Sequence, residues 1–252
     1  MKQNKIDRRQ FNSAALGSLV TMSLLESLFA ADAFGAEVKP VAANWLRGMH
    51  DMSNDLKGQK LTQVQWQAKI EELFQQVELA KLLEFVDFEK LTKDLKFRER
   101  GERAMRPRFP AVEGLPTKLV FGHQIFAMKQ GQSVAPHGHN NMATAFLVLK
   151  GDFHGRHYDR LEDLDEHLII KPTIDDTFGA AQYSTISDHK DNIHWFKAKS
   201  KVGFIFNIHV LNVDPQSKRS GRVYVDPNGE KISEGRIRAR RVSAKEAYDL
   251  YG

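Results

Sequence analysis

Histidine is the residue whose number and spacing in this sequence point to chemistry. Nine of the ten histidines lie between His123 and His209, and two of them, His137 and His139, are separated by a single residue. Residues two positions apart on a β-strand project from the same face, so both imidazoles can bind one metal ion. The chain has no cysteine, which excludes a thiolate metal site, an iron–sulfur cluster, a disulfide scaffold and a cysteine nucleophile. Any metal must therefore be bound by imidazole and carboxylate groups.

Two glycines frame the histidine pair. Five residues separate Gly131 from His137, and Gly151 ends the apolar segment that follows Thr144. This framing resembles the first signature of the cupin family, in which Gly, His-x-His, Glu and a second Gly follow one another at these intervals. Thr144 stands where the family usually has Glu, so it supplies no carboxylate ligand, and its hydroxyl would hold a bound water or ligand.

The cupin resemblance implies a third ligand. The second cupin signature contains one more histidine, and His194 fits it best. The resemblance then implies that His137, His139 and His194 are metal ligands on the inner wall of a small β-barrel, with the remaining coordination positions open. Three neutral imidazoles leave a divalent ion its full charge, which favours an anionic substrate or activation of water. Fe(II) is the preferred metal, although Zn, Mn, Ni or Cu would also accept three imidazoles.

A narrower resemblance, to cupins of the cysteine dioxygenase type, depends on His209. That group uses a three-His iron site without the Glu ligand, and fifteen positions after its third ligand comes the histidine of a Ser-x-His-x-Tyr segment. His209 stands fifteen positions after His194, but Asn207 and Leu211 replace the Ser and the Tyr. The resemblance implies that His209 lies beside the metal, while the missing phenol argues against thiol oxygenation in particular.

Four further residues are expected near the substrate. In the dioxygenase-type cupins an Arg before the barrel binds the substrate carboxylate, and the resemblance implies this role for Arg106 or Arg108. A solvated basic linker is the alternative for either residue. His154 and His157 follow the second framing glycine and would line the barrel mouth or extend the metal site. Because they are three positions apart on a strand, at most one of them points inward.

Hydrophobic periodicity predicts the elements that position these residues. Apolar residues recur at helical spacing after the N-cap Thr62, so residues 37–117 are predicted to be a helical segment and a basic linker. Short β-branched and aromatic runs over 118–215 predict a sandwich or barrel, which the resemblance identifies as a cupin barrel. Residues 216–252 are predicted to form a basic hairpin and a short helix. The expected fold class is mainly β, a single cupin (double-stranded β-helix, jelly-roll) barrel preceded by an α-helical N-terminal segment.

The first 36 residues are predicted to be an export signal. Basic residues precede a charge-free run from residue 11 to residue 25, and cleavage is expected after Ala33 or Ala36. Arg8 and Arg9 resemble the twin-arginine export motif, with an ordinary secretory signal or a membrane anchor as the alternatives. This signal predicts a periplasmic or exported protein with no stable membrane span after its removal.

The distribution of charged residues indicates which kinds of partner to expect. Without residues 1–36 the chain holds 33 Lys and Arg against 29 Asp and Glu, and residues 216–242 hold eight basic against three acidic side chains. A solvated, positively charged strand edge explains this stretch better than an anionic partner does, and export argues against nucleic acid. By family analogy, the basic hairpin is a candidate edge for a homodimer.

Two classes of function follow. The preferred one is an exported, mononuclear non-haem metalloenzyme, a dioxygenase-like oxidoreductase that acts on a small anionic molecule. The alternative is a non-catalytic cupin that binds a small metabolite or sugar in the barrel, since one scaffold hosts many functions. Thr144 and Leu211 favour this alternative, because each removes an ionisable group from the site.

Overall fold

The computed structural model describes residues 38–109 and 118–252, with side chains described from residue 42 onward. The predicted export signal and part of the predicted linker lie outside the described residues. Within the described ranges, no helix is both long enough and apolar enough to cross a membrane.

Helices precede the sheets, as predicted. Thr62 begins the second of these helices with a capping box, in which its hydroxyl accepts a hydrogen bond from the Gln65 backbone N–H at 3.2 Å and the Gln65 side chain accepts one from the Thr62 N–H at 2.9 Å. The N-terminal helices are α3 (Val38–Lys57), α4 (Gln63–Gln75), α5 (Leu79–Phe85) and α6 (Phe88–Thr92).

The strands form two antiparallel sheets. One is five-stranded, in the order β1-β2-β9-β4-β7, and the other closes into a six-stranded barrel in the order β10-β11-β6-β5-β8-β3. The fold is therefore mainly β with a closed barrel, as predicted. The strands are β1 (Arg103–Met105), β2 (Gly122–Lys129), β3 (Ser133–Asn140), β4 (Met142–Lys150), β5 (Phe153–Asp163), β6 (His167–Phe178), β7 (Tyr183–Ile186), β8 (Ile193–Ala198), β9 (Val202–Leu211), β10 (Gly221–Lys231) and β11 (Ile237–Val242).

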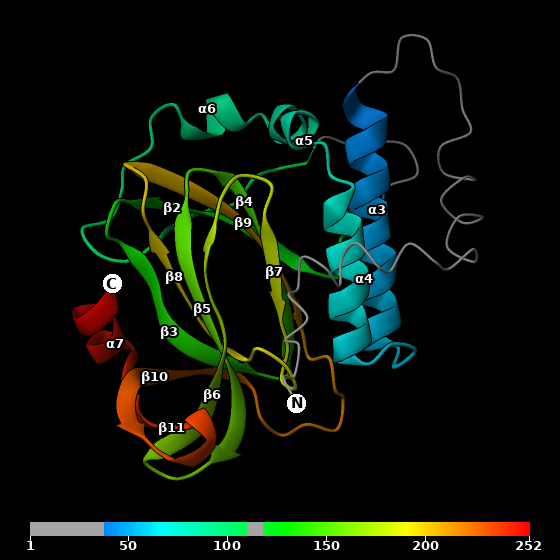
Figure 1. The fold of residues 1–252 in the computed structure, drawn as a ribbon. Coiled ribbons are helices and arrows are strands. Elements are labelled where there is room, and N and C mark those ends of the chain that lie inside the picture. The colour runs from blue at the N-terminus through cyan, green and yellow to red at the C-terminus, as the bar shows by residue number, and fades with distance from the viewer. Residues whose placement is uncertain (1–37, 110–117) are drawn as a thin grey trace, which may run out of the picture. The chain divides into compact units, whose positions relative to one another are not determined.

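The five-stranded sheet is buried on both faces. One face packs against the N-terminal helices, which lie beside it in Figure 1, through a cluster that includes Trp45, Phe74 and Phe206. The other face packs against barrel strands through a second cluster, to which Phe126 and Phe196 belong. Because side chains alternate along a strand, β2 and β9 contribute to both clusters. The helices therefore hold the sheet from behind, and its opposite face is free to build a site with the barrel strands.

The C-terminal segment completes the barrel. A hairpin of β10 and β11, with a 3₁₀ turn (Ser233–Gly235) between them, is followed by α7 (Ala244–Tyr251). The hairpin also pairs on both sides, β10 with β3 and β11 with β6. The predicted boundary at residue 215 thus separates two stretches of sequence that share one sheet.

The burial of Phe74 leads to a prediction about stability. Its side chain is 1% exposed, and its ring lies 5.6 Å from that of Trp45 and 5.9 Å from that of Tyr183. Phe74→Ala should lower the free energy of unfolding by about 3–5 kcal/mol, because it removes contacts and leaves a cavity. Val64→Ala in the same helix, where the side chain is 42% exposed, should cost far less. Urea unfolding measures both, and equal costs would contradict this packing.

Candidate metal centre and its cavity

Three histidines converge on the inner side of the barrel. His137 and His139 lie on β3 and His194 lies on β8, and the two strands pair with His137 opposite His194. All three side chains are buried, and one ligand atom from each lies within 4.8 Å of the others. The ring of His194 is 4.2 Å from that of His137 and 5.1 Å from that of His139, centroid to centroid. The three residues predicted as ligands are therefore close enough to bind one metal ion together.

A glycine between the two β3 histidines allows this close approach. A β-carbon at Gly138 would lie 2.4 Å from Oδ1 of Asn192, the residue that precedes β8, so only glycine leaves room there. The Asn192 amide donates hydrogen bonds to the carbonyl oxygens of His139 at 3.0 Å and Ser187 at 2.9 Å. Glycine and amide together fix the start of β8, and with it His194, against β3.

Backbone hydrogen bonds orient two of the imidazoles. Nδ1 of His137 donates to the carbonyl of Ala135 at 2.8 Å, and Nδ1 of His194 donates to that of Asn192 at 3.2 Å. In a neutral ring this leaves Nε2 as an unprotonated acceptor. The Nε2 of His194 and the hydroxyl of Thr144 are among the buried polar atoms of the described residues that have no hydrogen-bond partner. An unsatisfied buried polar group costs on the order of 1–3 kcal/mol, so this donor set fits a bound metal and a ligand beside it.

Burial keeps the three imidazoles neutral. Removal from water lowers the pKa of His137, His139 and His194 well below the usual value, and the positive charge of Arg222 lowers each pKa further. Neutral imidazole is the form that binds metals. At neutral pH, protons therefore do not compete with a metal for these nitrogens.

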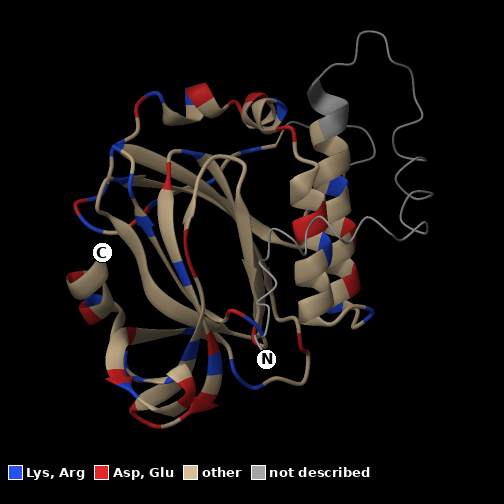
Figure 2. Ribbon diagram, viewed as in Figure 1, with Lys and Arg blue, Asp and Glu red and all other residues tan. Residues whose placement is uncertain are grey.

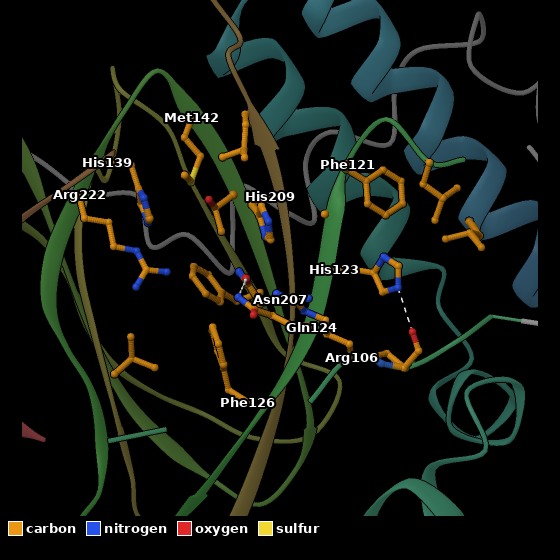
Figure 3. A pocket seen from close by; sticks show the side chains of 18 of the residues that line it. Arg106, Phe121, His123, Gln124, Phe126, His139, Met142, Asn207, His209 and Arg222 are labelled. Atoms are coloured by element: carbon orange, nitrogen blue, oxygen red, sulfur yellow. Dashed lines mark hydrogen bonds between the residues drawn. The ribbon is translucent and has the colours of Figure 1, made fainter. Parts of the chain in front are cut away.

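A cavity of about 1010 Å³ opens beside the histidines. Its lining includes Gln124 and Phe126 on one face of β2, His123 on the other face, and Phe121 just before the strand (Figure 3). None of the described lining residues is Asp or Glu, and the Lys and Arg side chains among them are Arg106, Arg108, Lys118 and Arg222. A concave surface with charge of one sign attracts ligands of the opposite sign, so this cavity favours anions.

His209 and Thr144 both line the cavity, on neighbouring strands. They are directly paired between β9 and β4. On the other side of β9, Gly122 pairs with His209, and a β-carbon there would lie 2.2 Å from Nε2 of His209. Burial lowers the pKa of His209, and the charge of Arg222 lowers it further. The imidazole of His209 is thus held as a neutral group in the cavity wall.

The two positions that depart from the dioxygenase-type pattern also line the cavity. Oδ1 of Asn207 accepts a hydrogen bond from the Gln124 amide at 3.1 Å. Leu211 is 45% exposed, at the end of β9. The cavity therefore has an amide and an apolar side chain where that pattern has a hydroxyl and a phenol.

The predicted substrate arginines lie in the segment after β1. Arg106 and Arg108 are exposed and line the cavity. Between them, the carbonyl of Pro107 accepts a hydrogen bond from Nε2 of His123 at 3.0 Å (Figure 3). Phe109 packs on the same imidazole, with the ring centroids 4.5 Å apart. His123 therefore ties this cationic segment to β2, and its role is in packing and hydrogen bonding.

His154 and His157 are not brought to the cavity, which corrects the expectation that they line its mouth. His154 is turned to the surface, where it contacts Asp175, while His157 is fully buried. The opposite orientations agree with their three-residue spacing. The ring of His157 lies 6.3 Å from that of His194, and its Nε2 is 3.4 Å from Oγ of Ser184. His157 is thus packed among barrel residues, and neither histidine is among the lining residues.

Arg222 is a cavity residue that was not predicted from the sequence. It lies on β10 opposite His139, and Tyr224 lies opposite His137, so both share the cavity face of β3. In the sequence, Arg222 belongs to the basic stretch interpreted as a solvated edge. The alternation of Arg222, Tyr224 and Asp226 with valines and proline is a signal of a two-faced strand, but only the pairing of β10 with β3 shows which face meets the histidines.

Comparison with known proteins gives low similarity. No protein-family model matches the chain, and no curated protein matches it. Among solved structures, it is similar to a cupin superfamily protein from Desulfitobacterium hafniense (14% identity, TM-score 0.31, covering 46% of this chain and 84% of that one). It is also similar to a Klebsiella pneumoniae protein with a double-stranded β-helix domain (9% identity, TM-score 0.35, covering 54% and 94%).

11S globulins form a second group of matches. Procruciferin, an 11S globulin from Brassica napus, has 12% identity and a TM-score of 0.31, over 42% of this chain. This chain spans only 23% of procruciferin. With such low TM-scores the matches do not assign the chain to a family, and the fold and the site are defined by strand order, register and side-chain geometry.

The lowered pKa of His123 leads to a pH prediction. Burial lowers this pKa below the usual value of 6.5, so below about pH 6.5 the unfolded chain binds a proton that the folded chain does not. The contribution of His123 to stability is therefore complete above that pH and is lost as the pH falls toward the folded pKa. His123→Gln should reduce the slope of stability against pH by up to about one proton. Urea unfolding at a series of pH values measures the slope, and a His123 ring that titrates at or above 6.5 by NMR would contradict the prediction.

Proposed function

We propose that the protein is a mononuclear metalloenzyme, with Fe(II) preferred, that oxidises a small anionic substrate with O₂. The observation that carries this proposal is the position of three buried, neutral imidazoles beside a cavity whose ionised lining residues are all cationic. A divalent metal bound by His137, His139 and His194 would supply open coordination positions and, as iron, redox chemistry. The substrate would be held by the protein's own charges.

The residues around the centre have distinct tasks in this proposal. Arginines at the cavity bind the anionic group of the substrate, because a guanidinium matches planar oxyanions. Phe126 and Phe146 are almost fully buried and exclude water from the inner wall. The Thr144 hydroxyl has no other described partner and can hold a ligand beside the metal. His209 and Asn207 offer polar groups from β9 for orienting the substrate.

The chemistry proposed is dioxygenase-like but not specifically thiol oxygenation. Three imidazoles without a carboxylate match the cysteine dioxygenase type, and His209 keeps its spacing from His194. Leu211 supplies no phenolic hydrogen bond at the position where that type has Tyr. We also propose that residues 1–36 are a twin-arginine signal, which would deliver a folded, metal-loaded protein to the periplasm.

A second candidate, a non-catalytic cupin that binds a small molecule, is favoured by one observation. Neither Thr144 nor Leu211 can exchange a proton near neutral pH, although both line the cavity. The metal would then be structural or would bind the ligand directly.

Metal content tests the ligand assignment. Purified protein should contain about one metal ion per chain, because the three imidazoles form one site. His137→Ala and His194→Ala should each lose most of this metal by elemental analysis. His154→Ala, which changes a histidine outside the cavity, should retain it. Full retention in both ligand variants would rule out the centre.

Oxygen uptake separates the two functions. Iron-loaded protein should consume O₂ with at least one member of a panel of small acids and thiols, and His194→Ala should not. Ligand-induced thermal stabilisation without any O₂ uptake across the panel would instead support the binding protein.

A further inference from the structure

Arg222 differs from every other arginine of the basic C-terminal stretch. Five arginines there form ion pairs: Arg219 and Arg241 with Asp163, Arg236 with Glu234, Arg238 with Glu230, and Arg240 with Glu246. Figure 2 shows acidic and basic residues mixed over β6, β10 and β11. Arg222 has no ion pair and no hydrogen bond with any described residue. Among the described arginines of this stretch, Arg222 is the one without an acidic partner.

The guanidinium of Arg222 points into the cavity. Arg222 faces His139 across the β10–β3 pair, and Figure 3 shows its side chain extending from the same wall as His139 toward the middle of the cavity. After burial, its charge is one of the causes that lower the pKa of all four site histidines, whereas Arg106 acts on His209 alone. Among the cavity cations, Arg222 therefore lies in the best position to act beside the metal centre.

The neighbouring carboxylate of Glu102 already has a hydrogen-bond partner in Tyr248. Glu102 is buried and accepts hydrogen bonds from the hydroxyl of Tyr248 at 2.9 and 3.0 Å. Burial raises the pKa of Glu102, and the charge of Arg222 is among the smaller influences that lower it. Glu102 makes no ion pair with Arg222, and it does not line the cavity. The guanidinium therefore remains available to an anion from outside.

Much of the rest of the inner wall is apolar. Phe126, Val134 and Phe146 are 2–4% exposed and line the cavity between the two sheets. At the ends of β4 and β9, Met142 and Leu211 pair directly and also line it. Leu211 is one of the few large apolar residues that the described chain leaves exposed. A cavity of about 1010 Å³ is at the upper end of the usual range for small-molecule sites, so a bare small anion would leave most of this surface wet.

We propose that Arg222 binds the anionic group of the substrate, and that the substrate is an amphiphilic acid whose apolar part covers the Met142–Leu211 rim. This inference rests on the proposed metal centre for its functional meaning. It replaces Arg106 and Arg108 as the main anchor and leaves them to attract the anion toward the cavity. The ligand chemistry is an oxyanion, with carboxylate as the form to test first, joined to an unbranched or aromatic hydrocarbon.

Straight-chain carboxylates are the probes for this site. Butyrate, hexanoate and octanoate are titrated by calorimetry into the full-length protein, both metal-loaded and chelator-treated, with octanamide as the neutral comparison. Affinity should rise about fourfold for each added methylene that is buried. Octanamide should bind about tenfold or more weakly than octanoate, because it cannot form the charge-assisted pair.

Two pairs of variants test separately the binding of the anionic group and the binding of the apolar part of the ligand. Arg222→Gln should lower octanoate affinity about tenfold or more, remove the preference over octanamide and keep the metal, while Arg219→Gln should behave as wild type. Leu211→Ser should weaken octanoate more than butyrate. Its control is Leu164→Ser, since both leucines are 45% exposed and Leu164 lies outside the cavity. Thermal unfolding checks that each variant is folded.

The outcomes separate this inference from the proposed function. Unchanged octanoate binding in a folded Arg222→Gln variant, or loss of binding in Arg106→Gln instead, would overturn the role of Arg222. Equal affinity for butyrate and octanoate would overturn the apolar part. If octanoate binding depends on Arg222 but the protein binds no metal even after incubation with metal ions, the inference about Arg222 stands and the proposed metalloenzyme is overturned.

Discussion

The pairing of β3 with β8 is the constraint on which the rest of the site depends. It sets His194 opposite His137, and it requires Gly138, because any larger residue would collide with Asn192. The Asn192 amide then bonds the backbone of His139. A shift of one residue in this register would turn the imidazoles to the other face of the strand and separate them. The candidate metal centre therefore depends on strand pairing as much as on residue type.

Burial keeps these imidazoles in the neutral form that can bind a metal. Hydrogen bonds to backbone carbonyls satisfy Nδ1 of His137 and His194. No described group satisfies Nε2 of His194 or the hydroxyl of Thr144. The neighbouring strand β10 adds the positive charge of Arg222, which further disfavours protonation of the histidines. The same charge favours an anion in the cavity beside the three imidazoles, so the proposed binding of a metal and of an anionic substrate would depend on one electrostatic arrangement.

Much of the site could be predicted from local patterns. The Thr62 capping signal marks the start of α4, and the His-x-His spacing places His137 and His139 on one face of a strand. His194 was predicted from its resemblance to the second cupin signature, and His209 from its position fifteen residues after His194. The two residues lie on different sheets. The position of Arg222 could not be predicted, because it depends on the long-range pairing of β10 with β3. The sequence of a basic stretch does not show whether its arginines form ion pairs with carboxylates or line a cavity. For His154 and His157, spacing could predict that at most one points inward, but neither which one nor that His157 is packed beside Ser184.

The most direct test of the metal centre is a crystal structure with anomalous diffraction recorded at the absorption edge of the bound metal. The account predicts one strong anomalous peak per chain, at about 2.0–2.2 Å from a ring nitrogen of each of His137, His139 and His194. Nε2 should be the bonding atom in His137 and His194, because their Nδ1 atoms donate to carbonyls. A peak bound by other residues, or a fully occupied metal that leaves His194 uncoordinated, would contradict the account.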